Sequence, residues 1–465
     1  MKAADGMRSL DIPDFLFIVG ELSLLLFGVL TGLAFAFPVA ALAGAIAFLL
    51  LNKRPVTNSL GLAVISFCLL WGMTLPEVHF AIHDIFIGLS LVLFLIKVVS
   101  GETSLPGLSS MVGWMGAFCL MILLSLVVGM AHGNGTAALI TEAHNLAYYL
   151  LFFVVLGSLH DRDSSRHLAS FAVVAAVLVA VQYLFLVVSA GHFFRVNSYH
   201  ADLFVLTMPL TLSLGLFVRK VHWKVLCFAM FLLQVAALLV SFTRAGWVAS
   251  GVGSAIVLLF FRPRRASHRG WVVLAIAFAL VAVVFVYYAG TDILSGFARS
   301  ESVTQVAQRA ETMGWGVEDA GLWMRVELAV SALEQFAKYP ILGAGLGDVV
   351  RYRIFSDDST WSLDNTHLQI LWKMGLVGFG VYIGLLTVVL KRSLYVFRRT
   401  DEWFYKWISG GIFGGFCGLI LISFFSASLS KYNLNLVWAI MIAVVEDEAI
   451  RLDRKSSHPD VNAPS

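Results

Sequence analysis

Charged residues are scarce in this sequence. Of 465 residues, 13% are charged and 59% are hydrophobic, whereas soluble domains carry about 25% charged residues. The mean hydropathy is +0.86, so a soluble globular protein is excluded and a chain that crosses a membrane many times is predicted. The net charge of +3 is too small to favour a nucleic-acid partner, and membrane lipids are the expected surroundings.

Disulfide-forming cysteines, repeats and a cleavable leader are also lacking. The sequence has four cysteines, all inside apolar segments: Cys68, Cys119, Cys227 and Cys417. Cysteines in such places are typical of small core residues and not of a disulfide framework or a metal site. The first apolar run, from about Phe15, has no small-residue cleavage site after it, so we expect it to remain as a helix.

Long apolar runs recur along the whole chain. A membrane-spanning helix needs about 20 apolar residues, and runs of that length predict about 12–14 spans. They lie near residues 14–34, 36–52, 58–76, 80–98, 111–131, 142–160, 168–190, 201–218, 225–241, 246–261, 271–289, 367–390, 407–428 and 433–446. The predicted fold is therefore an all-α polytopic bundle.

The same pattern divides the chain into four parts. They are a transmembrane bundle over 1–289, a hydrophilic loop domain over 290–366, C-terminal transmembrane helices over 367–446 and a cytoplasmic tail over 447–465. Lysine and arginine mark the cytoplasmic loops of membrane proteins, and their clusters alternate consistently when the N-terminus is inside. This orientation places the 290–366 loop on the outer side.

Two arginines do not fit this distribution of charge. Arg195 and Arg244 stand alone in segments that the orientation places outside. An arginine held near the membrane on the unexpected side is costly, so it usually has a functional role or a paired partner. Snorkelling to lipid headgroups, or pairing with a nearby carboxylate, is the alternative for each of them.

The outer loop domain contains one amphipathic helix and a glycine-rich segment. Apolar residues recur at helical spacing over 322–338, and Pro340 ends the pattern. The helix is expected to lie along the membrane surface or the top of the bundle, with Arg325 directed toward the bilayer edge. The glycines of 340–348 resemble a phosphate-binding loop, but no strand pattern precedes them, so a flexible turn is predicted.

The end of the loop domain carries the strongest functional signal. Asp364, Asn365 and Thr366 are residues that favour a helix N-cap, and Thr366 with Gln369 fits a capping box. His367 is then expected in the first turn of a membrane helix.

A helix N-terminus has two chemical consequences for this histidine. It disfavours the imidazolium form, so His367 stays neutral as a base must be, and its free N–H groups favour an anionic ligand. A neutral histidine beside an anion site is a candidate acid–base group. The alternative is a structural histidine held by hydrogen bonds. Metal binding is not expected, since only His192, His200 and Asp202 approach metal-ligand spacing.

Three motifs in order resemble a known family. The segments SFTRAGW, KYPILGAGLG and DNTHLQILWKMGLVGFGVY are similar to those of the O-antigen ligase and O-antigen polymerase superfamily of bacterial envelope enzymes. The resemblance is strongest from about Ser241 to Tyr382. It implies a GT-C-like helical fold in the bacterial inner membrane, an active site that faces the periplasm, and no metal or other cofactor. It also implies a donor glycan on undecaprenyl pyrophosphate and, for a ligase, a sugar of lipid A core as acceptor.

The resemblance also implies roles for individual residues. The family's loop histidine falls on His367, with Asp364 and Asn365 beside it, and its essential outer arginines fall on Arg244 and Arg325. In this reading His367 is the base that activates the acceptor hydroxyl. The arginines bind the diphosphate, because guanidinium stays charged and can hold phosphate oxygens in a bidentate way.

Four further cations are candidates for binding the diphosphate or the acceptor phosphates. Arg195 lies where many relatives have an arginine, although VNSYHAD follows it here in place of the family's NxN-like turn. The others are cations of the outer loop: Lys338, Arg351 and Arg353. Salt bridges with the aspartates of the same loop explain these three equally well.

The sequence favours the ligase over three alternatives. A polymerase would use a second lipid-linked repeat unit as acceptor, but polymerases often have two large outer loops and this chain has one. A protein O-oligosaccharyltransferase frequently has an extra C-terminal soluble domain. A transporter would be expected to have repeated halves with broken helices at matching positions, and the sequence has no such halves.

Overall fold

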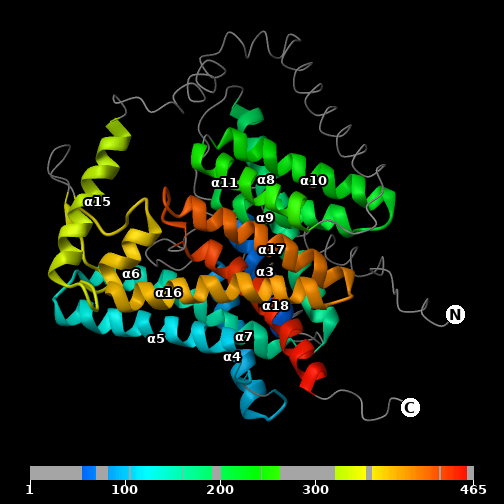
Figure 1. Ribbon diagram of the computed structural model, residues 1–465, viewed down its shortest axis with the longest axis horizontal. Coiled ribbons are helices and arrows are strands. Elements are labelled where there is room, and N and C mark those ends of the chain that lie inside the picture. Colours follow the sequence, from blue (N-terminus) through cyan, green and yellow to red (C-terminus); the bar gives the residue numbers. More distant parts are fainter. Residues whose placement is uncertain are drawn as a thin grey trace, which may run out of the picture.

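The computed structural model describes residues 55–69, 82–103, 106–159, 161–190, 201–241, 243–261, 320–351, 359–428 and 431–457. Helices make up most of these residues (Figure 1). The elements are α3 (Pro55–Leu69), α4 (Ile82–Val99), α5 (Ser110–Ala131), α6 (Thr136–Ala147), the short 3-10 helix η1 (Tyr148–Leu150), α7 (Leu151–Ser158), α8 (Arg162–Ala190), α9 (Ala201–Phe217), α10 (Val221–Val240), α11 (Arg244–Phe260), α15 (Ala320–Lys338), β1 (Val350–Arg351), β2 (Ser359–Thr360), α16 (Thr366–Arg399), α17 (Trp403–Ile422) and α18 (Tyr432–Ser457).

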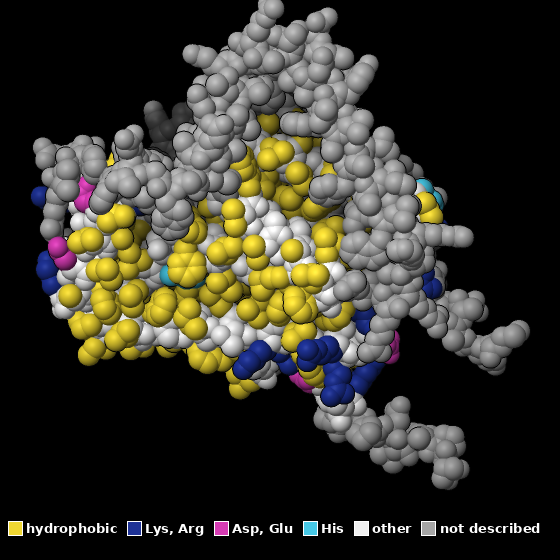
Figure 2. Space-filling view, turned by 45° about the horizontal axis from the view of Figure 1, so that its top comes forward, with side chains coloured by type: hydrophobic (Ala, Val, Ile, Leu, Met, Phe, Trp, Pro, Cys, Tyr) yellow, Lys and Arg dark blue, Asp and Glu magenta, His cyan; other side chains and the backbone are white. Residues whose placement is uncertain are grey.

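Several of these helices are long and apolar enough to cross a membrane. Within the described residues there are six: Ser110–Ala131, Thr136–Ser158, Arg162–Phe185, Val221–Val240, Thr366–Arg399 and Trp403–Ile422. Figure 2 shows a face covered largely by hydrophobic side chains, with lysines and arginines gathered along its lower edge. The chain is an all-α polytopic membrane protein. The spans predicted near 14–34, 36–52 and 271–289 lie outside the described residues.

A face of small residues on α17 brings three helices close together. A Cβ atom added at Gly414 would lie 2.6 Å from the carbonyl oxygen of Gly253 in α11, and one at Gly411 would lie 2.7 Å from the Cα of Leu210 in α9. Only a helix surface without side chains permits such an approach, and membrane helices commonly pack in this way. The glycines of α17 therefore fix α9 and α11 against it.

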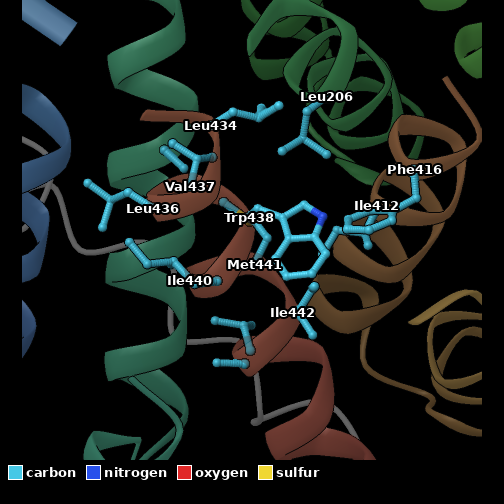
Figure 3. Packing of buried hydrophobic residues seen from close by; sticks show 14 of the residues in the cluster. Leu206, Ile412, Phe416, Leu434, Leu436, Val437, Trp438, Ile440, Met441 and Ile442 are labelled. Atoms are coloured by element: carbon cyan, nitrogen blue, oxygen red, sulfur yellow. The ribbon is translucent and has the colours of Figure 1, made fainter. Parts of the chain in front are cut away.

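The buried core lies between α9, α17 and α18. Trp438 of α18 is almost fully buried, and its ring lies 5.2 Å from Phe416 of α17 and 5.0 Å from Tyr149 of η1, centroid to centroid. Figure 3 shows Trp438 with Leu206 and Ile412 around it. This packing holds α17 and η1 against α18.

The amphipathic helix α15 contacts α16 through one narrow face. Leu328 and Ala332 are buried in a small cluster with Leu363 and other apolar residues. The apolar stripe that was predicted to meet the membrane includes Val326 and Val330, and both remain exposed. The prediction of a helix over 322–338 agrees with α15, and its exposed stripe is available to lipid.

Helix α16 is interrupted at Gly375. This residue has φ 64° and ψ −168°, outside the helical region, and a left-handed φ is readily adopted only by glycine. The chain before it forms a short half-helix that starts at Thr366, and the chain after it continues to Arg399. The sequence predicted a single span over 367–390, so the break was not foreseen.

The glycine-rich segment 340–347 replaces the hydrogen bonds lost at the break. Ala344 N–H and Gly345 N–H each donate over 3.0 Å to the carbonyls of Trp372 and Lys373, and Leu376 N–H donates over 2.9 Å to the carbonyl of Pro340. The amides of this segment therefore bind protein acceptors and not a phosphate. The predicted flexible turn is instead a packed segment, because these bonds close open positions of α16 and Leu346 N–H donates to the carbonyl of Ser125 in α5.

Candidate functional site

The half-helix of α16 begins with a capped turn. Asn365 is the N-cap residue, and its side-chain oxygen accepts a hydrogen bond of 3.0 Å from Leu368 N–H. The predicted capping box of Thr366 and Gln369 is wrong in detail. The Thr366 hydroxyl donates instead to the carbonyl of Ser426, 2.9 Å away. The cap nonetheless places His367 in the first turn, as predicted.

His367 is a buried side chain with both ring nitrogens engaged. It is 8% exposed. Its Nε2 lies 3.0 Å from the carbonyl oxygen of Ile420, and its Nδ1 lies 3.2 Å from the hydroxyl of Tyr382. A carbonyl can only accept, so Nε2 carries the proton and neutral Nδ1 accepts from the phenol. If Nδ1 takes up a proton, the same hydroxyl can rotate and accept, so the site accommodates both protonation states.

Asp364, three positions before His367, forms an ion pair with Arg325 of α15. Arg325 Nε donates to Asp364 Oδ2 over 3.2 Å, and both side chains are about half exposed, at 52% and 58%. The predicted residues Arg325, Asp364, Asn365 and His367 are thus brought together at one corner of the molecule. A guanidinium held there can bind a phosphate from solution or from a membrane surface.

The backbone of Arg244 lies at the same end of the bundle. It is the first residue of α11. A Cβ at Gly418 would lie 2.8 Å from the carbonyl of Ala249, and one at Gly414 would lie 2.6 Å from that of Gly253. The two helices therefore run in opposite directions, which places the start of α11 beside the end of α17. The carbonyl of Ile420, which binds His367, is at that end of α17.

An ion pair that the sequence did not reveal lies behind His367. Lys431 Nζ donates to Asp202 Oδ2 over 2.7 Å, and the hydroxyl of Ser426 donates to the same carboxylate oxygen over 3.0 Å. The carbonyl of Ser426 accepts from Thr366, the neighbour of His367. These contacts fix the connection between α17 and α18 against the start of α16. Asp202 was considered only as a metal ligand, and its contacts are those of an ion pair.

Two further predicted cations lie within the described residues, and of these Lys338 is distant from the corner. Lys338 ends α15 and donates to Gln335 over 3.4 Å, and Arg351 is in the strand β1, paired with β2 in register Arg351↔Ser359. Lys338 is thirteen positions beyond Arg325 on one helix, which corresponds to about 20 Å. Arg195 and Arg353 lie outside the described residues, as do His192 and His200.

Comparison with protein families identifies the segment that carries this corner. Residues 229–383 match the family described as O-antigen ligase. This part of the chain is similar to the O-antigen ligase family. No curated protein matches the chain. This match confirms the resemblance found in the sequence, and it supports, in general terms, a glycosyltransferase-like function of O-antigen ligase or polymerase type.

The matched segment contains most of the candidate residues. Arg244, Arg325, Asp364, Asn365 and His367 lie within the matched range, which ends one residue after Tyr382. Tyr382 was not predicted, because nothing in the sequence indicates that a residue fifteen positions from His367 would reach it. The paired residues Asp202 and Lys431 lie outside the matched segment. The rest of the chain therefore contributes the support behind the histidine.

Proposed function

We propose that the chain is an inner-membrane glycosyltransferase that moves an O-antigen glycan from undecaprenyl pyrophosphate to a sugar hydroxyl of lipid A core on the periplasmic face. The observation that carries this proposal is the environment of His367, which is buried between Ile420 and Tyr382 within the segment that matches the O-antigen ligase family. A neutral imidazole held by a carbonyl on one side and a rotating hydroxyl on the other suits general-base catalysis.

The reaction divides between His367 and the arginines. The acceptor oxygen attacks the anomeric carbon, its proton passes to the Tyr382 hydroxyl as that hydroxyl's own proton passes to Nδ1 of His367, and the bond from that carbon to the diphosphate breaks. Undecaprenyl pyrophosphate leaves with the bonding electrons, and the anomeric centre is inverted. Arg244, Arg325 and Arg195 are assigned to the growing negative charge on the diphosphate. Loss of one such donor commonly lowers the rate by about 10² to 10³.

The apolar surface of the bundle supports a lipid-linked donor. Leu376 and Val377, which follow the break in α16, are exposed. A polyprenyl chain is apolar and can stay in the bilayer while its diphosphate reaches the corner that holds Arg325 and His367. No cofactor is assigned, and chelation is expected to leave the reaction unchanged.

The test is transfer by the purified protein in lipid. It receives undecaprenyl pyrophosphate-linked glycan, with and without rough lipopolysaccharide as acceptor, in the presence of EDTA, and the products are followed by gel. A lipopolysaccharide of lower mobility that requires the acceptor is the expected product. His367→Ala should abolish it while the protein still accumulates in the membrane, and unchanged transfer by this variant would overturn the assignment of the base.

Two other outcomes of this test identify the alternative functions. Lengthened lipid-linked glycan without added acceptor would indicate the polymerase. No product in either mixture would indicate that the chain acts on lipid-linked glycan without transferring it, as a transporter would. The single long hydrophilic segment of the sequence, over 290–366, favours the ligase.

A further inference from the structure

A fully buried ion pair joins α6 to the half-helix of α16. The Lys373 ammonium donates to the carboxylate of Glu142, and the two side chains are only 2% and 4% exposed. Burying two charges is costly unless their remaining hydrogen-bonding groups are also satisfied. The contacts of the pair beyond each other therefore indicate what it holds in place.

Two of these contacts lead to the segment that carries Asp364. Lys373 Nζ donates to the carbonyl of Trp361 over 2.6 Å. Gln369 links the pair to the same segment, since its amide donates to Glu142 over 3.2 Å and its oxygen accepts from Leu363 N–H over 3.3 Å. The backbone is thus held on both sides of Ser362, directly before Asp364.

The pair also holds the glycine-rich segment. Gly347 N–H donates to Glu142 Oε2 over 2.6 Å. A cavity of about 20 Å³ borders the pair and has room for about one water molecule. Among the residues that line it are Glu142, Lys373, Gln369, Trp361 and Asn145.

The exposed pair of Arg325 and Asp364 cannot position itself. Ion pairs between half-exposed side chains contribute about 0–1 kcal/mol, because two flexible side chains must be ordered in water. The backbone that carries Asp364 must then be fixed from elsewhere. Leu363 is anchored by Gln369 and packs in the same cluster as Leu328 of α15, three residues after Arg325.

We propose that the buried Glu142–Lys373 pair is a positioning device for the Arg325–Asp364 pair, so that Glu142 and Lys373 are positioning residues for the transfer reaction. This inference rests on the proposed function for its kinetic consequence. Its structural consequence, the fixed backbone of residues 361–364, can be measured without any reaction.

The kinetic test is a double-mutant cycle. Glu142→Leu with Lys373→Met removes both charges while keeping the volume, and is expected to lower kcat/KM for the lipid-linked donor by about tenfold to hundredfold. In an Arg325→Ala background the same double substitution should have little further effect, because the pair acts through Arg325.

A second buried pair on the same helix provides the control. Arg392 of α16 binds Glu446 of α18 through two hydrogen bonds of 2.8 and 2.9 Å, at the far end of α16 from His367. Arg392→Met with Glu446→Leu should affect folding to a similar degree, and any loss of transfer should add to that of Arg325→Ala. If the loss of transfer caused by Glu142→Leu with Lys373→Met also adds to that of Arg325→Ala, the proposal is overturned.

A further variant applies if this double variant does not fold. Gln369→Leu interrupts the same contacts without leaving a buried charge unpaired. Its loss of transfer should likewise not add to that of Arg325→Ala.

A nitroxide at position 362 keeps the inference separate from the proposed function. Ser362→Cys is labelled in a protein whose four native cysteines are alanine. We expect the label to be immobilised, to become mobile when Glu142 and Lys373 are replaced, and to stay immobilised when Arg392 and Glu446 are replaced. If the unmodified protein transfers no glycan, the proposed function fails, and the mobility of the label alone then tests whether the Glu142–Lys373 pair fixes the backbone of residues 361–364. Equal mobility in all three proteins would overturn the positioning role.

Discussion

The Nδ1 atom of His367 lies 3.2 Å from the hydroxyl of Tyr382, although both residues belong to α16 and are fifteen positions apart. In a straight helix their Cα atoms would be about 22 Å apart. The contact exists because α16 is interrupted at Gly375 and the half-helix turns back toward the rest. The position of the candidate base therefore depends on one glycine.

Gly375→Ala is expected to destabilise the protein. A Cβ at this position would lie 2.2 Å from the carbonyl oxygen of Ile341, and the residue has φ +64°. Left-handed strain and overpacking together correspond to about 2–5 kcal/mol. Thermal unfolding of the purified protein in detergent should show a clearly lower Tm.

Gly380 in the same helix is the matched control. A Cβ there would meet nothing within 4 Å, and alanine is favoured over glycine inside a helix by up to about 1 kcal/mol. Gly380→Ala should therefore leave Tm unchanged or raise it slightly. If Gly375→Ala and Gly380→Ala lower Tm equally, the left-handed conformation of Gly375 is not what stabilises the half-helix.

Tyr382→Phe is expected to slow transfer while leaving donor binding intact. When His367 holds a proton at Nδ1, the phenol oxygen is its acceptor, and phenylalanine leaves that N–H without a partner. A buried unsatisfied group corresponds to about 1–3 kcal/mol, or about fivefold to 150-fold in kcat. Steady-state kinetics should show this loss in kcat with KM for the donor nearly unchanged. A larger change in KM than in kcat would argue against a role in proton transfer.

The sequence predicted most of the helices but not their distortions. Hydrophobic runs identify α5 and α10 to within about four residues at each end and α17 to within about six, because each run is long and uninterrupted. Gly375 lies inside an equally apolar run, and a glycine in a membrane helix is common. Its left-handed conformation depends on the segment 340–347, which is distant in sequence and supplies the missing hydrogen bonds.

The candidate site was predicted where the signal was local. Asn365 and His367 could be placed at a helix start, because N-cap preferences act over three or four residues. The partners of this site could not be placed in the same way, since Glu142 and Lys373 are separated by 231 positions. A signal was nonetheless present: each is a charge within an apolar run, and such residues usually have partners.

Arg325→Ala is expected to lower kcat/KM for the lipid-linked donor by about 10² to 10³, as for other groups that stabilise a charged leaving group. Arg166 is a control of similar kind, because it forms a half-exposed pair with Asp163 over 3.4 Å at the start of α8. Arg166→Ala should change the rate by no more than about twofold. Arg325→Lys should recover only part of the rate, since an ammonium cannot hold two phosphate oxygens in the same plane. Full activity of Arg325→Ala would remove this residue from the site.

Replacing Lys431 tests whether the pair behind His367 supports the fold. Lys431→Met leaves the Asp202 carboxylate, which is 2% exposed, without the ammonium that binds it. The expected loss is about 1–3 kcal/mol, measured as a lower Tm in detergent. Adding Asp202→Asn should recover much of that loss, because a neutral amide needs no counter-charge and can still accept from the hydroxyl of Ser426. If the double variant loses as much stability as the two single variants together, the two side chains do not stabilise each other. The connection between α17 and α18 would then be held by its backbone bonds to Thr366 alone.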